Sequence, residues 1–420
     1  MMRRHGGSFP WGIGVAAILG VILGVLLGER ASSLGELATL LIRCLKGLAT
    51  PLVFFTVIDT FSQFEIQLKN TLRLLSLSLL NAAVAGMIAL SVFSLAPVEP
   101  NEHLIFLGQK LGSESAARVS TANPPGVVSI LSSSIPTSVL DPFIQNNVIA
   151  ATILAMGIGI FLRKLKRDAQ MQKEADTLIR FFSGGARVMS ELLGWVVKLI
   201  PFAVFGVLAK VVGLGGFKFI PALSLFVLIV MGAIFVHSFI YYPLFIRVLG
   251  QAHFFRDAAG PISNAFGAGS SLATLPITLQ TLREKMKVSE ESARLAACVG
   301  TQFNHNGILL YEAVAALFVA KAHGIVLGVG QKIILLGASV LAAVGIAGVP
   351  EAGLITLSLV LSALNLPLTL IPLLMTVDWF MGRLRAASNV LGDMVVAVAL
   401  DRWDEWSDGN PRRKQKSRGN

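Results

Sequence analysis

Apolar runs long enough to cross a lipid bilayer recur through the first 250 residues of this sequence. A helix needs about 20 apolar residues to span a hydrocarbon core of about 30 Å, because it rises about 1.5 Å per residue. The runs that approach or exceed this length are residues 11–28, 36–62, 71–97, 146–162, 185–212 and 219–248. Their repetition predicts an all-α integral membrane protein with many spanning helices.

The low share of charged residues excludes most soluble classes. Charged side chains make up 14% of the 420 residues, against about 25% in soluble domains. This deficit excludes a disordered chain, a coiled coil and an ordinary soluble enzyme. The two cysteines, Cys44 and Cys298, lie in apolar runs and form neither a disulfide framework nor a metal-binding pattern. The sequence contains no CxxC, HExxH, GxSxG or P-loop pattern, so we expect no enzyme and no cofactor.

The distribution of positive charge predicts the topology. Lys and Arg number 35 and Asp and Glu 24, which gives a net charge of +11. Basic residues cluster after the fourth run and in the tail at 401–420, and such clusters mark the cytoplasmic side. With the run at 11–28 retained as a first helix, we expect a multi-pass protein of the bacterial inner (plasma) membrane with both termini in the cytoplasm. The excess charge then reports topology, so we expect no nucleic-acid partner, although the tail can contact anionic lipid.

Two later segments are interrupted by small and polar residues. NAFGAGSSLATLP divides the stretch at 255–285, and GIAGVPEAG divides the stretch at 327–366. Each predicts a helix, a non-helical tip and a second helix. Non-helical backbone at membrane depth is tolerated only inside protein or beside a watery cavity, and paired interruptions point to a transporter binding site. The alternative is two ordinary glycine-rich loops that join short helices.

The last apolar segment carries charges that need partners. At helical spacing one stripe contains Asp378, Gly382, Arg385, Asn389 and Asp393, whereas Arg383 points elsewhere. A charge at mid-membrane costs at least about 2.5–3.5 kcal/mol. Arginine suits bidentate recognition of a carboxylate, and carboxylate and amide oxygens can bind Na⁺. The stripe therefore predicts a site for an anion and a cation; internal salt bridges between helices are the alternative.

The segment GTQFNHNGILLYEAVAALF also places polar groups in an apolar helix. Asn304, Asn306 and Gly307 predict local unwinding, which frees carbonyl groups as cation ligands. Glu312 lies two turns further on, and an intramembrane glutamate is by default a candidate proton carrier. A hydrogen-bonded buried acid is the alternative for Glu312.

The segments LYEAVAALF, AGVPEAG, VDWF and NVLGD, in this order, resemble the dicarboxylate/amino acid:cation symporter family, which includes the excitatory amino acid transporters. The resemblance implies eight transmembrane helices, two re-entrant helical hairpins and a homotrimer with an elevator mechanism. Residues 1–250 would be mainly scaffold and trimerisation part, with helices 3 and 6 belonging to the transport domain. Residues 251–400 would be the transport core, made of hairpin 1, helix 7, hairpin 2 and helix 8, and 401–420 a basic cytoplasmic tail.

The resemblance also implies roles for individual residues. The implied substrate-binding residues are Ser270 and Ser271 at the first hairpin tip, Val349 and Gly353 in the second hairpin, and Arg385 and Asn389 in the last helix. Arg385 would grip a substrate carboxylate. The implied sodium site comprises Gly300, Asn304, Asn389 and Asp393, and Glu312 matches the residue that carries a proton in proton-coupled members. Arg383 matches an arginine that some members place before the hairpin serines, where this chain has Gly269.

Several positions depart from the family pattern. Asn306 and Ile308 stand where the family has an aspartate and a threonine, and Leu272 replaces the third hairpin serine. Gly382 replaces the aspartate that faces the amino group of a substrate, and Ala386 replaces a threonine. In the third helix, Leu77, Leu80 and Asn81 fall where hydroxyl ligands are expected. These departures bring one cation site and the amino-group site into question.

Together these features predict a secondary active symporter that couples Na⁺ and/or H⁺ influx to uptake of a small anionic solute. Gly382 favours a C4-dicarboxylate over an acidic amino acid. One alternative is a glutamate/aspartate carrier with rearranged contacts. Another is a paralogue that does not transport, or that conducts anions without coupling.

Overall fold

The computed structural model describes residues 8–63, 68–105, 138–144, 148–345 and 352–407, and every regular element among them is a helix. Val349, a predicted substrate contact, and residues 408–420 of the predicted tail lie outside the described residues. The last helix continues to Ser407, so the first part of the segment expected to be a tail is helical.

The helices of the first 250 residues follow most of the apolar runs, but Asp141–Ile144 lies outside them and the run at 185–212 breaks between Val197 and Ile200. They are α1 (Ser8–Leu27), the 3-10 segment Gly28–Gly35, α2 (Glu36–Gln63), α3 (Leu68–Leu95), α6 (Asp141–Ile144), α7 (Val148–Lys166), α8 (Gln172–Val197), α9 (Ile200–Gly215), α10 (Ile220–Val236), a π-helical turn (His237–Tyr241) and α11 (Tyr242–Leu249). Proline opens α9, α10 and α11, where its missing N–H has no partner to lose. Gly250 ends α11 with a φ of 71°, a conformation that glycine adopts without strain.

The remaining helices form the part that holds most predicted site residues. They are α12 (Phe254–Ala268), α13 (Ser271–Gln280), a π-helical turn (Thr281–Lys285), α14 (Glu290–Arg294), a second π-helical turn (Leu295–Val299), a 3-10 turn (Gly300–Gln302), α15 (Asn306–Ala322), α16 (Val329–Gly345), α17 (Ala352–Ala363) and α18 (Ile371–Ser407). Phe303–His305 is not helical, which confirms the predicted unwinding at Asn304. The prediction was wrong for Asn306 and Gly307, which form the first turn of α15.

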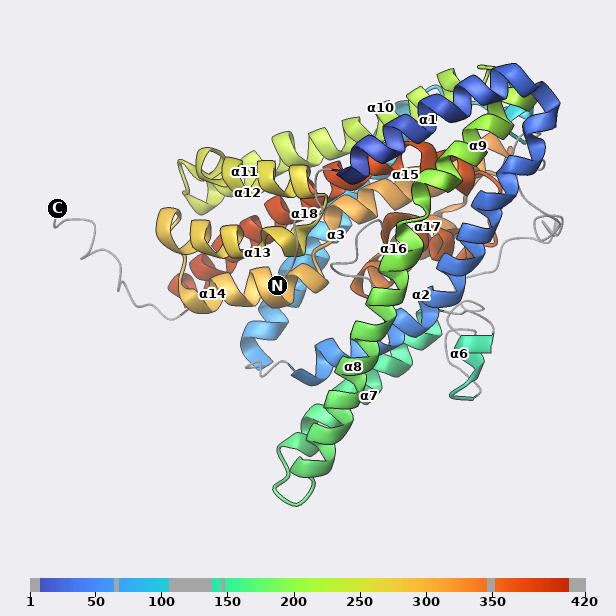
Figure 1. Cartoon of the computed structure of the whole chain (residues 1–420). Helices are drawn as coiled ribbons and strands as arrows, with labels where there is room; N and C mark the ends of the chain where they lie inside the picture. The colour runs from blue at the N-terminus through green and yellow to red at the C-terminus, as the bar shows by residue number, and fades with distance from the viewer. Residues whose placement is uncertain (1–7, 64–67, 106–137, 145–147, 346–351, 408–420) are drawn as a thin grey trace.

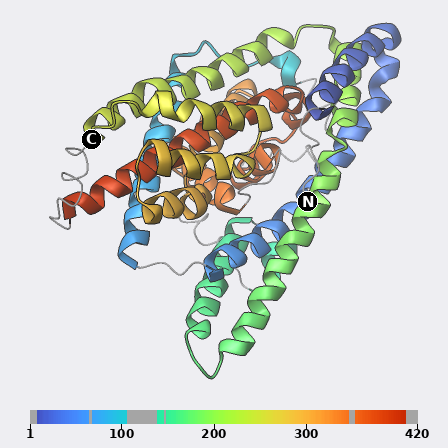
Figure 2. The same ribbon diagram turned by 60° about the vertical axis from the view of Figure 1, so that its left-hand side comes forward.

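The helices form a long layer and a compact bundle. In the layer α1 packs along α9, and α2 contacts α7, α8 and α9. In the bundle α18 contacts α12, α13, α15 and α17. Figure 1 and Figure 2 show the layer running along one side of the bundle, with the α7–α8 pair projecting beyond it. This division resembles the predicted scaffold and transport core, but their separate movement stays a prediction.

The interrupted segment at 255–285 folds as two helices joined by a tight tip. α12 ends at Gly269, whose φ of 64° suits a residue without a side chain. Ser270 caps α13, because its hydroxyl accepts a hydrogen bond from the backbone N–H of Ala273 at 3.3 Å. α12 and α13 contact each other, as do α16 and α17 from the other interrupted segment.

Helices of membrane-spanning length occur within the described residues. Gly12–Gly35, Leu72–Leu95 and Ile220–Leu249 are each long and apolar enough to cross a bilayer, and Gln172–Val196 with Ile200–Gly215, bent by 41°, would make a fourth span. α1 exposes Val15, Ile18, Leu19, Ile22, Val25 and Leu26, as expected of a helix that faces lipid. The number of eight spanning helices stays a prediction.

Candidate functional site

A buried ion pair lies on the polar stripe of α18. Arg385 donates from Nη1 to Oδ1 of Asp378 at 2.6 Å and from Nη2 to Oδ2 at 3.1 Å. The exposed fraction is 4% for the arginine side chain and 1% for the aspartate. Seven residues make about two helical turns, so both side chains lie on one face of the helix. The stripe is confirmed, and this salt bridge lies within one helix rather than between helices.

The guanidinium of Arg385 is enclosed by two other helices. Its Cζ lies 4.3 Å from the centre of the Tyr311 ring on α15, a distance at which the ring attracts the cation. Gly353, near the start of α17, lies directly against the guanidinium, and a methyl group at this position would overlap its Cζ, Nη1 and Nη2 atoms. Gly353, a predicted substrate-binding residue, can lie this close to Arg385 because it has no side chain.

The start of α15 is joined to α18 next to this ion pair. The side-chain oxygen of Asn389 accepts a hydrogen bond from the backbone N–H of Gly307 at 2.8 Å. That N–H belongs to the first turn of α15, where backbone donors lack partners inside the helix. Asn389 thus satisfies a helix terminus and stands one turn beyond Arg385 on α18.

The predicted sodium ligands Asn304 and Asp393 are in direct contact. Asn304 donates from Nδ2 to Oδ1 of Asp393 at 3.2 Å, and both residues are buried. The backbone carbonyl of Gly300 accepts hydrogen bonds from the N–H groups of Phe303 and Asn304, both at 2.8 Å. Asp393 of α18 thus supplies a carboxylate, Asn304 a side-chain amide and Gly300 a backbone carbonyl near the start of α15. Oxygen ligands of these kinds suit a hard cation.

A hydrogen-bonded group that we call the amide cluster extends from Asn304. It comprises Asn81 on α3, Asn304, Asn306, Tyr241 and Tyr242. The side-chain oxygen of Asn304 accepts from Nδ2 of Asn306 at 2.8 Å and from Nδ2 of Asn81 at 3.3 Å. Asn306 also donates to the Tyr242 hydroxyl at 3.0 Å, and the Tyr241 hydroxyl donates to Asn81 at 2.8 Å. Neutral groups thus surround the position where the family pattern has an aspartate.

Sequence reasoning did not select Tyr241, Tyr242 or Tyr311 as site residues. The signal for the first two was the segment HSFIYY inside the apolar run at 219–248. It folds as a π-helical turn that leads into α11, and such turns are common at functional sites. Tyr311 stands directly before Glu312, within a segment that carried the family resemblance.

Glu312 on α15 is fully buried beside the helix pair α16–α17. Its exposed fraction is 0%, and within the described residues neither carboxylate oxygen meets hydrogen-bond geometry. Ser339 on α16 and Thr356 on α17 approach it with their hydroxyl groups. Glu312 therefore lies near one hydroxyl group on each of the two helices α16 and α17.

Arg383 and Arg385 of α18 face different partners. Nη1 of Arg383 approaches Gly269 at the tip between α12 and α13, lying 3.2 Å from where a Cβ atom would be. The structure thus brings Arg383 to the position before the hairpin serines, as the family resemblance suggested. Ser270 and Ser271 are half-buried at this tip, and among the described residues no hydrogen bond joins them to Arg385.

Residues 9–403 match the sodium:dicarboxylate symporter family. The chain belongs to this family. It is 34% identical over 256 residues to the excitatory amino acid transporter of Caenorhabditis elegans, and this match covers 60% of this chain and 50% of the relative. It is 32% identical over 251 residues to excitatory amino acid transporter 3 of Mus musculus, and this match covers 59% of this chain and 47% of the relative. It is 28% identical over 417 residues to the C4-dicarboxylate transport protein of Bordetella avium, and this match covers 96% of this chain and 91% of the relative.

This symporter-family chain spans about half the length of the first two relatives and almost all of the third. The family and these relatives are named as transporters, which agrees with the expectation that the chain is not an enzyme. Their names include both dicarboxylates and excitatory amino acids, so the choice between these substrates depends on the site.

Proposed function

We propose that this chain is a secondary active symporter that couples Na⁺ influx to uptake of a small anionic solute. The observation that carries the proposal is Arg385, buried where α15, α17 and α18 meet and neutralised by Asp378. A buried charge needs a partner, and planar arginine binds carboxylates in bidentate fashion. Asp378 therefore serves as the counter-ion that a substrate carboxylate would replace or join.

The charges around Arg385 favour a C4-dicarboxylate over an acidic amino acid. Both oxygens of Asp378 accept from Arg385, and Gly382 supplies no second acid on the stripe. An ammonium group would have to compete with Arg385 for Asp378, which weakens that ion pair, because Gly382 places no second acid beside them. Succinate, fumarate or malate avoids this cost because it has no amino group.

Na⁺ coupling is supported by the oxygen groups at Asp393, Asn304 and Asn389. Asp393 is the only carboxylate of this set, and the amide cluster adds no further charge. We expect one principal Na⁺ position here. A separate proton route would use Glu312, since an unpaired buried carboxylate is far less costly when it carries a proton.

The membrane setting and assembly follow from the same proposal. We expect a multi-pass protein of the inner (plasma) membrane with cytoplasmic termini, which assembles as a homotrimer and moves its bundle against the layer. The apolar face that α1 exposes supports contact with lipid.

Uptake into proteoliposomes tests the function. The purified chain, reconstituted without other proteins, should accumulate labelled succinate when an inward Na⁺ gradient is imposed and not when choline replaces Na⁺. Arg385→Gln should abolish accumulation, whereas Arg180→Gln, at an exposed position on α8, should retain Na⁺-driven uptake. Absence of Na⁺-driven uptake of succinate, malate, aspartate and glutamate in folded protein would favour the paralogue that does not transport.

A further inference from the structure

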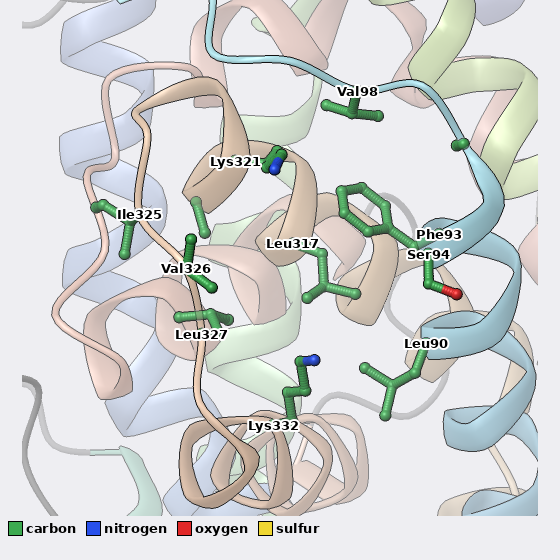
Figure 3. A pocket seen from close by; sticks show the side chains of 12 residues that line it. Leu90, Phe93, Ser94, Val98, Leu317, Lys321, Ile325, Val326, Leu327 and Lys332 are labelled. Atoms are coloured by element: carbon green, nitrogen blue, oxygen red, sulfur yellow. The ribbon is translucent and has the colours of Figure 1, made fainter.

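A pocket of about 250 Å³ lies at the far end of α15, between α3 and α16. Its apolar wall includes Leu90 and Phe93 of α3, Leu317 of α15 and Val326 of the segment that leads to α16. Figure 3 shows these side chains around a common space. The wall alone would fit many apolar molecules, so its charged members decide what binds there.

Two lysines line this apolar pocket. Lys321 stands in the last turn of α15 and Lys332 in the first turn of α16, and both are half-buried. Figure 3 shows them on opposite sides of the apolar side chains. Within the part of the chain that the structure describes, neither forms an ion pair, including with Glu99 and Glu102 just after the lining residue Val98. The pocket thus combines an excess of positive charge with an apolar wall.

The pocket is separate from the site around Arg385. Lys321 lies ten residues beyond Tyr311 on α15, about 15 Å along the helix axis. None of the lining residues belongs to α17 or α18. A ligand here would touch neither Arg385 nor Asp393, and so would not be the anion bound at that site.

We propose that this pocket binds an amphipathic monocarboxylate, with its carboxylate paired with one of the two lysines, Lys321 or Lys332, and its chain against Leu90, Phe93 and Leu317. The volume equals that of about eight waters at about 30 Å³ each, which suits a carboxylate with about ten non-hydrogen atoms.

Such a ligand would connect the end of α15 to the start of α16. Since α16 leads towards Ser339, next to Glu312, bound carboxylate would restrict the helix pair α16–α17. We therefore expect the ligand to slow transport without competing with the transported anion. This consequence rests on the proposed function, whereas binding itself does not.

Equilibrium binding of labelled octanoate to the full chain in phosphatidylcholine nanodiscs tests the site, with empty nanodiscs as background. The wild type should bind octanoate saturably and bind uncharged octanamide at least about tenfold more weakly. Lys321→Gln/Lys332→Gln should weaken octanoate binding at least about tenfold. The matched control Lys164→Gln/Lys173→Gln removes the same charge from exposed positions on α7 and α8 and should bind as the wild type does.

Several results would each overturn the proposal that the pocket binds a monocarboxylate. They are no saturable binding above empty nanodiscs, equal loss in both double variants, equal binding of octanamide, and displacement of octanoate by phosphatidylglycerol, which would make a lipid the occupant. Loss of octanoate binding in Arg385→Gln but not in the pocket variant would assign the ligand to the transport site. None of these binding results depends on whether the chain transports succinate, so failure of one proposal does not decide the other.

Discussion

Asn306 donates a hydrogen bond to the hydroxyl of Tyr242 at 3.0 Å, which joins the start of α15 to the start of α11. The family pattern has an aspartate at this position, and a carboxylate there would contribute a charged cation ligand. In this chain a neutral amide makes its contacts with other protein groups. Asp393 is left as the nearby acid.

The first prediction concerns sodium stoichiometry. Because Asn306 adds no charge, uptake should rise with Na⁺ concentration with a Hill slope clearly below about three, the upper limit for three coupled ions. Asn306→Asp should steepen the slope, because the new carboxylate needs a cation. The measurement is initial uptake against Na⁺ concentration at fixed pH. A wild-type slope of about three, with no effect of pH, would refute the prediction.

The second prediction concerns protons. If Glu312 carries a proton through the membrane, acid outside should stimulate wild-type uptake at constant Na⁺ gradient. Glu312→Gln mimics the protonated acid and should remove this stimulation while Na⁺-driven exchange persists. The measurement is uptake under separately imposed pH and Na⁺ gradients. Equal stimulation by acid in both proteins would place the proton elsewhere.

The third prediction concerns the arginine. Arg385→Ala should weaken binding of the anionic substrate at least about 100-fold, since loss of one partner of a buried charge pair costs about 3–5 kcal/mol. Arg180→Ala, at an exposed position on α8, serves as the control. Because Arg385→Ala leaves Asp378 buried and unpaired, the double variant Asp378→Asn/Arg385→Gln should fold better and still bind weakly. Normal affinity in either folded variant would move the site away from Arg385.

The polar stripe of α18 and the tip of α12–α13 could be predicted because both depend on local rules. Spacings of three and four place Asp378 and Arg385 on one helix face, and a glycine followed by serines predicts a C-cap and an N-cap. The stripe does not predict the ion pair between Asp378 and Arg385, because helical spacing alone does not determine which side chains pair.

Contacts between distant helices could not be predicted from local pattern. Tyr242 meets Asn306 across 64 residues of sequence, and Gly353 meets Arg385 through the docking of α17 on α18. Tyr311 was overlooked because an aromatic residue in an apolar helix usually signals packing. These contacts depend on how helices pack, which a single sequence does not specify.

The fourth prediction uses the close approach of Gly353 to Arg385. In Gly353→Ala the new methyl group must displace the guanidinium, and overpacking of this kind costs about 1–3 kcal/mol. Substrate affinity should therefore fall at least about fivefold. Gly337→Ala on α16 is the matched control, since a Cβ atom there meets nothing within 4 Å. Equal affinity in both variants, measured by substrate-dependent thermal shift, would show that Arg385 does not need this contact to bind substrate.

The last prediction concerns Gly382 and the choice between dicarboxylates and amino acids. Gly382 lies one turn after Asp378 and three residues before Arg385, on the stripe that faces the site. Asp378 is committed to Arg385, and the other acid of the stripe, Asp393, lies eight residues beyond Arg385 and contacts Asn304. The wild type therefore offers an ammonium group no acid at the position of Gly382. Succinate should therefore displace bound label better than aspartate does.

Gly382→Asp supplies the missing acid and should reverse that order, because its carboxylate can pair with an ammonium while Asp378 stays with Arg385. Gly382→Asn, which has nearly the same size but no charge, is the control and should not favour aspartate. Competition against labelled succinate in nanodiscs measures both variants. If aspartate already competes far better than succinate in the wild type, the ammonium finds another partner. The assignment of the substrate to C4-dicarboxylates would then be wrong, although the role of Arg385 would stand.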